Sequence, residues 1–326
     1  MDGLNCKVSI LVPVYGVERY IERCAHSLFG QTYVDIEYVF VNDCTKDRSI
    51  DILKRVLKDY PNREQQVRIV RHEYNRGLAA ARNTAFDNST GEYVMHVDSD
   101  DFIETDAVEL FLKCAREKKA DIVVCDNRCV YKDHVVMQVQ TIPPQKQDYL
   151  TSLLIRRIQP SIWGKFFYRE FYKKSGVRAV EGVNFGEDYA FVPRIVYYAN
   201  VIVKLDCFLY NYVLYNNQSY TKNISVETLH SLCEVDKILD NFFSSVPDST
   251  NYTKTLIIAK LRTKTYLLKI SGMKLWKVIM HLYPELSHYE YLLPMPDRLI
   301  LWMLCHKWFR LLKGILVIRT LFQRHK

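Results

Sequence analysis

The first 125 residues alternate between short apolar runs and amphipathic segments, and this alternation restricts the fold more than any other feature. The segments between the runs repeat apolar residues every three to four positions, as at Ile21, Cys24 and Leu28. Such alternation is typical of βαβ units and predicts a mainly parallel sheet covered by helices on both faces. The apolar runs, which have the length of buried strands, lie at 7–14, 36–41, 67–70, 92–97 and 121–125.

Two of these predicted strands end in carboxylates. Asp43 follows the second strand, and Asp98, Asp100 and Asp101 follow the fourth. Ligands of parallel α/β sheets bind at the carboxyl ends of the strands, so Asp43 and Asp98 are expected to converge. Mg²⁺ and Mn²⁺ prefer carboxylate oxygen and are held by one or two carboxylates together with substrate phosphates. An exposed acidic turn before the next helix would account for the same residues.

Further charged residues complete a candidate site. Glu187 and Asp188 begin a predicted helix, where acidic residues are electrostatically favoured for structural reasons alone. Arg76, Arg82 and Lys165 could neutralise a diphosphate, although each could equally be a surface charge. Taken with Asp43 and the acidic strand end, they predict a site for a nucleotide-diphosphate donor. One carboxylate would bind the base, one group would hold the metal, and another carboxylate would accept a proton.

Several classes of protein are disfavoured by what the sequence lacks. No GxGxxG follows the first strand, and no GxxxxGK[ST] or GxSxG motif occurs. The net charge of +8 suits an anionic partner, but no recognised nucleic-acid module accompanies it, so no nucleic acid is expected as partner. Nine scattered cysteines without a CxxC, and a start that lacks a signal-peptide pattern, predict reduced thiols and a cytoplasmic location.

The C-terminal third has a different character. We expect residues 1–221 to form the nucleotide-binding domain and residues 222–326 to form a helical region. Residues 296–326 combine Trp302, Trp308 and many aliphatic side chains with seven basic residues and one acid, Asp297. This pattern predicts a basic amphipathic anchor that lies peripherally on an anionic membrane, at the inner face of the cell membrane. An ordinary packing helix with a solvated basic face is the alternative.

The motifs, taken together, resemble those of a known family. Six motifs occur in the order found in family-2 glycosyltransferases of GT-A fold, the inverting bacterial enzymes that build surface polysaccharides. The resemblance covers about the first 215 residues and implies a Rossmann-like, mainly parallel α/β fold. The six motifs are Ser9–Tyr15, Val41–Asp47, Asn75–Asn83, Val97–Asp101, Trp163–Lys165 and Gly186–Asp188.

The resemblance implies a role for each matching donor-site residue. Asp43 would accept the N–H of uracil or another base, and Asp98 would contact the ribose and sugar. Asp100 would be the main ligand of Mn²⁺ or Mg²⁺, with Asp98 as the second metal-site residue. The segment Pro13, Val14 and Tyr15 would border the nucleotide, next to the diphosphate that Arg76, Arg82 and Lys165 are expected from their charge to neutralise.

The resemblance also implies the reaction. Asp188 would be the general base, with Glu187 supporting it or exchanging roles with it. The expected activity is transfer of a sugar from a nucleotide-sugar donor, a UDP-sugar, to a hydroxyl of a glycan or lipid-linked acceptor. Gly16 and Cys44 depart from the family pattern but remove no carboxylate, and the Arg or His expected near Tyr215 is missing. A sugar-phosphate nucleotidyltransferase and a non-catalytic membrane-associated scaffold are the alternatives.

Overall fold

The computed structural model describes residues 6–216 and 224–323, with side chains through residue 316. Contacts divide the chain into two compact units. The first unit comprises Met1–Leu150 and Pro160–Tyr220, and the second comprises Thr151–Gln159 and Thr221–Lys326. The boundary predicted near Thr221 lies outside the described residues. Within residues 6–216 and 224–323, no helix combines the length and the apolar character needed to cross a bilayer.

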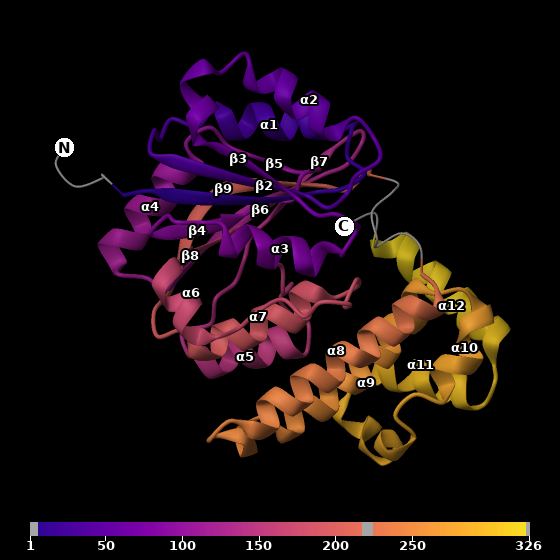
Figure 1. The fold of residues 1–326 in the computed structure, drawn as a ribbon. Helices are drawn as coiled ribbons and strands as arrows, with labels where there is room; N and C mark the ends of the chain where they lie inside the picture. Colours follow the sequence, from indigo (N-terminus) through magenta and orange to yellow (C-terminus); the bar gives the residue numbers. More distant parts are fainter. Residues whose placement is uncertain (1–5, 217–223, 324–326) are drawn as a thin grey trace. The chain divides into compact units, whose positions relative to one another are not determined.

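The first unit is built on one mixed sheet with strand order β3-β2-β1-β4-β8-β6-β9-β5, and β7 pairs with β6 (Figure 1). The pairs β1–β2, β2–β3 and β1–β4 are parallel, as is β6–β9. The α/β fold predicted from the strand–helix alternation is therefore confirmed. The strands are β1 (Val8–Val14), β2 (Ile36–Asn42), β3 (Val67–Arg71), β4 (Tyr93–His96), β5 (Phe102–Ile103), β6 (Ile122–Val130), β7 (Val135–Gln138), β8 (Lys165–Tyr168) and β9 (Ile202–Val213).

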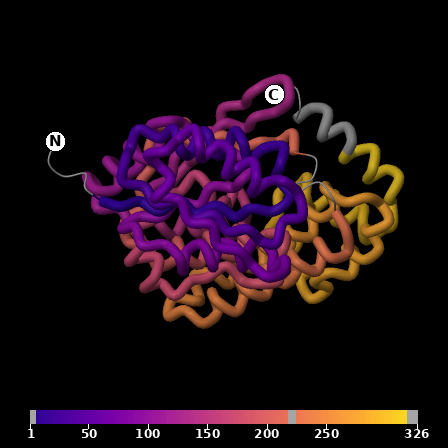
Figure 2. Tube along the Cα trace, turned by 45° about the horizontal axis from the view of Figure 1, so that its top comes forward, coloured from indigo at the N-terminus to yellow at the C-terminus, as the bar shows by residue number. Residues whose placement is uncertain are grey.

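Helices cover both faces of this sheet (Figure 1). Alternate residues of β1, including Val8, Ile10 and Val12, share one buried cluster with residues of α1, α2 and α4. The opposite face of β1 contacts α3, whose three successive alanines allow close approach. Figure 2 follows the chain through these layers. The helical elements of this part are α1 (Ile21–Phe29), α2 (Ser49–Leu57), η1 (Pro61–Gln66), α3 (Leu78–Asp87), α4 (Ala107–Lys118), α5 (Lys146–Leu154), α6 (Arg169–Ser175) and α7 (Glu187–Tyr198).

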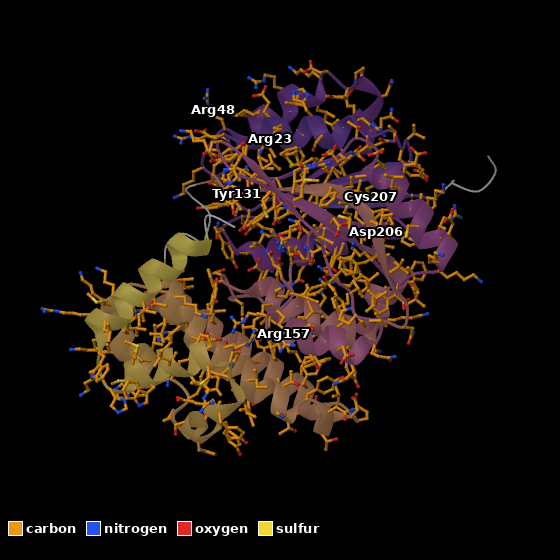
Figure 3. All side chains as sticks on the ribbon, turned by 180° about the vertical axis from the view of Figure 1, so that it is seen from behind. Arg23, Arg48, Tyr131, Arg157, Asp206 and Cys207 are labelled. Carbon is orange, nitrogen blue, oxygen red and sulfur yellow. The ribbon has the colours of Figure 1, made fainter. Side chains whose placement is uncertain are left out.

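Two local features differ from the pattern expected from sequence. The runs 201–205 and 208–213 predict two strands, but they form the single strand β9. Its parallel register with β6 skips Asp206, Cys207 and Leu209, and this irregularity interrupts the sequence pattern. Figure 3 labels Asp206 and Cys207. The weakly patterned stretch 130–160 contains β7 and α5. The exposed apolar residues of β7 do not alternate with polar ones, so periodicity gave no signal there.

The described residues of the second unit are helical, which confirms the expected helical C-terminal extension. Ser225 and Thr228 form a reciprocal capping box that fixes the start of the first long helix. The stretch 296–326 is not one helix, because the chain turns at Lys307, whose φ is +59°. The elements are α8 (Val226–Ser245), η3 (Ser249–Asn251), α9 (Thr253–Ile270), α10 (Met273–Met280), η4 (Pro284–Leu292), α11 (Met295–Cys305) and α12 (Phe309–Gln323).

Candidate active site

The carboxyl ends of three neighbouring parallel strands define the candidate site. Because β2 and β4 both pair in parallel with β1, Asp43 and Asp98 follow strands that end at the same edge of the sheet as Tyr15. Pro13 and Val14 are the last residues of β1, and the Tyr15 side chain that follows them is exposed. A pocket of about 220 Å³ lies here, lined by Tyr15, Gly16, Glu18, Arg19, Thr45, Lys46 and Asp47.

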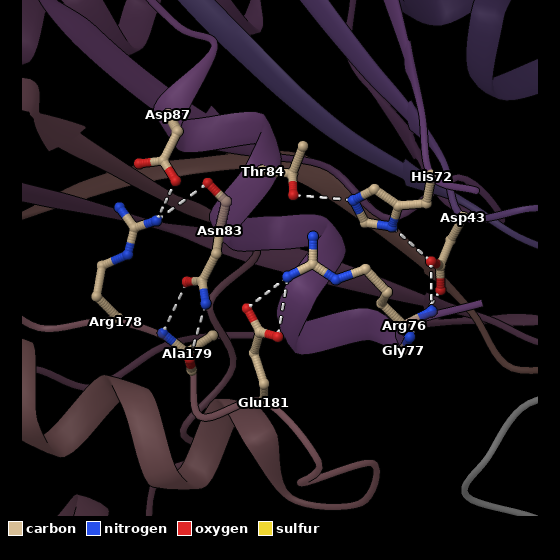
Figure 4. A network of polar contacts seen from close by, with 10 residues as sticks. All are labelled: Asp43, His72, Arg76, Gly77, Asn83, Thr84, Asp87, Arg178, Ala179 and Glu181. Atoms are coloured by element: carbon tan, nitrogen blue, oxygen red, sulfur yellow. Dashed lines mark hydrogen bonds and ion pairs between the residues drawn. The ribbon is translucent and has the colours of Figure 1, made fainter. Parts of the chain in front are cut away.

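Asp43 is held by three donors (Figure 4). Its Oδ1 accepts hydrogen bonds from His72 Nδ1 at 2.7 Å and from the Arg76 backbone N–H at 2.8 Å. Its Oδ2 accepts from the Gly77 backbone N–H at 2.8 Å. Gly77 is the N-cap residue of α3 and has a φ of +88°, a conformation that favours glycine. Asp43 is 3% exposed, so its carboxylate is a fixed acceptor rather than a mobile loop charge.

His72 makes a second hydrogen bond, which connects Asp43 to helix α3. The Nε2 of His72 lies 2.9 Å from Thr84 Oγ1 on α3, so the imidazole bridges Thr84 and Asp43 (Figure 4). The Arg76 side chain points elsewhere, forming an ion pair with Glu181 at 3.0 Å. Arg76 therefore meets Asp43 through its backbone. Neither His72 nor Thr84 was identified from the sequence, because a single histidine before a helix carries no motif.

Arg82 joins the acidic strand end to Glu187 and Asp188, the two carboxyls predicted to provide the general base. Its Nη1 lies 2.9 Å from Asp98 Oδ1. Its Nη2 lies 3.6 Å from Glu187 Oε1 and 3.5 Å from Asp188 Oδ1. The Arg82 side chain is only 2% exposed, and three carboxylates around one buried guanidinium compensate its charge. Glu187 and Asp188 occupy the first turn of α7, as the sequence predicts.

The buried carboxylates of this cluster have shifted acidities. Burial raises the pKa of Glu187 to about 8, and the neighbouring charge of Asp188 adds to the rise. Burial also raises the pKa of Asp188, against the lowering effect of Arg82 and of the Ile162 N–H that donates to its Oδ2 at 3.0 Å. Both carboxyls of the pair are therefore harder to ionise than an exposed carboxyl, and Arg82 and the Ile162 N–H favour the ionised form of Asp188.

Lys165 lies inside the protein rather than at the surface. It is 2% exposed on β8, and its Nζ donates to the Ser161 carbonyl. Burial lowers the pKa of Lys165 to about 8, while the charge of Asp188 acts in the opposite direction. The predicted diphosphate contact of Lys165 stays a prediction. Its amine is buried against the Ser161 carbonyl and lies within the electrostatic influence of Asp188.

The other two carboxylates of the acidic strand end have different partners. Asp101 is buried and accepts from Tyr210 Oη and from the Val213 N–H, both at 2.7 Å, so it ties this segment to β9. Asp100 Oδ2 accepts from Asn216 Nδ2 at 2.7 Å. Asn216 stands one position after Tyr215, where the family's Arg or His is missing.

Arg23 on α1 supports this end of the site (Figure 3). Its Nη1 donates to Tyr215 Oη at 2.6 Å, and its Nη2 donates to the Asp100 carbonyl at 3.4 Å. Its guanidinium also lies 4.2 Å from the centre of the Phe102 ring. Arg23 and Asn216 were missed by sequence reasoning, because their positions are linked only through the fold.

The acidic strand end fits a divalent cation that is shared with a ligand. Among residues 6–216 and 224–323, no group of three or more His, Cys, Asp and Glu side chains is arranged to hold a metal alone. Burial and the charge of Asp98 both raise the pKa of Asp100, so a cation between these carboxylates would relieve an unfavourable charge. One or two carboxylates with substrate phosphates are a usual Mg²⁺ arrangement.

The strand ends that carry Asp43 and Asp98 lie within the part of the chain that a protein-family model matches. The model described as "Glycosyl transferase family 2" matches residues 9–180, which is more than half of the chain. The chain belongs to glycosyltransferase family 2. The family resemblance found in the six sequence motifs is thereby confirmed.

Relatives of this family-2 chain span a range of bacterial glycosyltransferases. It is 32% identical over 212 residues to the uncharacterized glycosyltransferase EpsJ of Bacillus subtilis, covering 63% of this chain and 60% of EpsJ. It is 28% identical over 235 residues to the chondroitin synthase of Pasteurella multocida, covering 72% of this chain and 23% of the synthase. The chain thus spans less than two thirds of the length of these relatives.

Solved structures share the fold. TarS 1–349 of S. aureus, in complex with UDP-GlcNAc, matches with a TM-score of 0.70 at 19% identity, covering 93% of this chain and 88% of that chain. The mannosyltransferase PcManGT of Pyrobaculum calidifontis, in complex with GDP-Man and Mn²⁺, matches with a TM-score of 0.52 at 16% identity, covering 94% and 86%. These likenesses confirm the glycosyltransferase fold of this family-2 chain.

Proposed function

We propose that the protein is an inverting glycosyltransferase that moves a sugar from a nucleotide-diphosphate donor to an acceptor hydroxyl in surface polysaccharide biosynthesis. The observation that carries the proposal is the Arg82 cluster. It joins Asp98, the proposed donor-binding carboxylate, to Glu187 and Asp188 through one buried cation. Donor and proton acceptor would then be held by a single rigid group, as a reaction between two bound substrates requires.

In this proposal Asp188 is the general base. It accepts the proton of the acceptor hydroxyl while that oxygen attacks the anomeric carbon from the face opposite the diphosphate. The bond from the anomeric carbon to the diphosphate oxygen breaks, and the diphosphate leaves with the electron pair. One displacement inverts the anomeric configuration. Glu187, the adjacent buried carboxyl whose pKa is raised to about 8, would support Asp188 in this role.

The donor is proposed to be a UDP-sugar. Asp43 is an accept-only group whose position is set by His72 and by the Arg76 and Gly77 N–H groups, which suits the N–H of uracil. TarS, a structural neighbour, binds UDP-GlcNAc. Asp100 and Asp98 would hold Mn²⁺ or Mg²⁺, which when bound offsets the negative charge on the leaving diphosphate. PcManGT, a more distant neighbour, was solved with Mn²⁺.

The acceptor is proposed to be a glycan or a lipid-linked intermediate at the inner face of the cell membrane. The names of the relatives support a glycan product, since chondroitin synthase is among them. A sugar-phosphate nucleotidyltransferase is less well supported, because the first strand leads into Pro13, Val14 and Tyr15 and not into a basic glycine-rich loop. A non-catalytic scaffold would have no need of the buried Glu187–Asp188 pair.

Calorimetric titration of UDP, with Mn²⁺ and with EDTA, tests the donor site directly. The wild type should bind UDP in Mn²⁺ and bind it at least tenfold more weakly in EDTA. Asp100→Ala should bind equally weakly under both conditions, whereas the exposed control Asp106→Ala should behave like the wild type. Wild-type UDP binding that is unchanged in EDTA would defeat the metal assignment. Absence of UDP binding would defeat the assignment of uracil as the base of the donor nucleotide.

A further inference from the structure

Helices α11 and α12 of the second unit expose a group of large apolar side chains. Met295, Leu299 and Trp302 are spaced at i, i+4 and i+7, so they lie along one side of α11. Trp308, which precedes α12, and Leu311 continue the group, and the rings of Trp302 and Trp308 lie 5.0 Å apart. The five side chains are between 43% and 69% exposed. We call these five residues the aromatic face.

The aromatic face is not required to fill the core of the helical unit. Other residues of the same two helices are buried instead, namely Ile300, Leu301, Met303, Leu304 and Leu312. The helices are therefore already anchored through their opposite sides. Two tryptophans, a methionine and two leucines in water are costly to expose together, and a contiguous patch of this kind marks an interaction site.

The charges of residues 295–316 are almost all positive. Arg298, Lys307, Arg310 and Lys313 are exposed in this stretch. Asp297 is the only acid between residues 295 and 316, and it is buried and paired with Lys269 at 2.8 Å. No acidic side chain of this stretch is therefore free to offset these four cations. The partner that fits is apolar at its centre and anionic at its rim.

A bilayer containing anionic lipid has this chemistry. Tryptophan favours the boundary between headgroups and acyl chains, aliphatic side chains favour the region just beneath it, and arginine and lysine favour anionic headgroups. We propose that the aromatic face inserts into the headgroup region of an anionic membrane and holds the enzyme at its surface. This inference extends the proposed membrane-linked acceptor, but it concerns a separate surface and is tested without any sugar transfer.

The experiment uses the full chain and two kinds of vesicle, phosphatidylcholine alone and phosphatidylcholine with phosphatidylglycerol. We expect sedimentation with the anionic vesicles and little with the neutral ones. The chain has four tryptophans, and Trp163 and Trp276 are buried. Trp302 and Trp308 should therefore dominate any change in tryptophan fluorescence. We expect the emission to shift to the blue on vesicle binding and to be quenched by brominated acyl chains.

Matched variants distinguish vesicle binding through the aromatic face from non-specific hydrophobic binding and from an effect of net charge. Leu299→Ser with Trp302→Ser should reduce the vesicle partition coefficient at least tenfold, while Val278→Ser, an exposed change on α10, should not. Arg298→Gln, Lys307→Gln and Arg310→Gln together should weaken anionic binding by roughly a hundredfold. The control removes three exposed charges from the first unit, as Lys54→Gln, Lys58→Gln and Lys118→Gln. It should leave binding within about threefold of the wild type.

Three results would overturn the inference. The first is absence of binding to anionic vesicles. The second is binding that persists unchanged in the Leu299→Ser, Trp302→Ser variant, provided its circular dichroism matches the wild type. The third is a wild type that binds no vesicles and whose solution mass, measured by light scattering, is twice that of the variant. The aromatic face would then be a contact between two copies of the chain. Because UDP titration is measured separately, failure here leaves the proposed donor site standing, and the reverse also holds.

Discussion

The guanidinium of Arg82 lies 2.9 Å from the carboxylate of Asp98, and the same guanidinium faces Glu187 and Asp188 at 3.6 and 3.5 Å. One residue of α3 therefore links the end of β4 to the start of α7. Arg82 is surrounded by carboxylates of the protein itself, and we expect it to have a positioning role in the cluster. A contact between Arg82 and a donor diphosphate remains a prediction from the sequence.

Replacing this cation should change the acidity of the proposed base. In Arg82→Gln, loss of the positive charge raises the pKa of Asp188 further, so more of Asp188 is protonated at neutral pH. The acid limb of the kcat profile should move to higher pH, and stability should fall by about 3–5 kcal/mol because three buried carboxylates lose their counter-charge. Arg82→Lys should move the limb less. An acid limb at the wild-type pH in a folded Arg82→Gln enzyme would contradict the positioning role.

The bridge from Thr84 through His72 to Asp43 makes a second prediction. In His72→Phe, Asp43 loses one of its three donors and is no longer fixed in orientation. Because hydrogen bonds to charged groups contribute about 1.5–3 kcal/mol, UDP affinity should fall by roughly ten- to a hundredfold in calorimetry. His134→Phe, at an exposed histidine paired with Asp133, is the control. Equal UDP affinity in His72→Phe and the wild type would remove His72 from the donor site.

Sequence reasoning succeeded where one segment carries the signal. The strand runs ending at Val14 and Asn42 and the helix beginning at Glu187 lie within about two residues of the predictions, because periodicity and adjacent polar residues mark them. It failed where the determining contact is distant. Asn216 reaches Asp100 across 116 positions, and Arg23 reaches Tyr215 across 192. No local pattern records such pairs, and only the folded sheet brings them together.

The same distinction applies to burial. Arg82 lies on α3 and Lys165 begins β8, and from sequence both basic residues suit the surface or a diphosphate. Both are 2% exposed, because carboxylates contributed by other elements compensate Arg82 and the Ser161 carbonyl accepts from Lys165. A compensated buried cation cannot be recognised from its own segment, since its partners lie up to 106 positions away along the chain.

A buried carboxyl in the second unit predicts a pH-dependent stability. Asp236 on α8 accepts from Thr263 Oγ1 at 3.0 Å and Tyr283 Oη at 2.7 Å, and burial raises its pKa to about 6. Because folding favours the protonated form, this contribution is complete below the ordinary pKa near 3.8 and is lost as pH rises through about 6. Denaturant unfolding should show Asp236→Asn gaining ~3 kcal/mol relative to the wild type between pH 4 and pH 7.

The control for this prediction lies on the same helix. Asp240 is a partly exposed carboxylate paired with Lys260, so Asp240→Asn should leave the pH dependence of unfolding close to that of the wild type. If the free energies of unfolding of Asp236→Asn and of the wild type changed equally across this pH range, the pKa of Asp236 would not change on unfolding and the prediction would be wrong.

The most direct test of the whole account is a panel of nucleotide sugars in which release of the free nucleoside diphosphate is measured with Mn²⁺, for the wild type and for Asp188→Asn. The account predicts turnover by the wild type with a UDP-sugar in the presence of a glycan acceptor. It also predicts a loss of at least a hundredfold in Asp188→Asn, with UDP affinity within about threefold of the wild type. Turnover by Asp188→Asn at the wild-type rate would contradict the assigned base, and absence of turnover with every donor and acceptor would contradict the proposed activity itself.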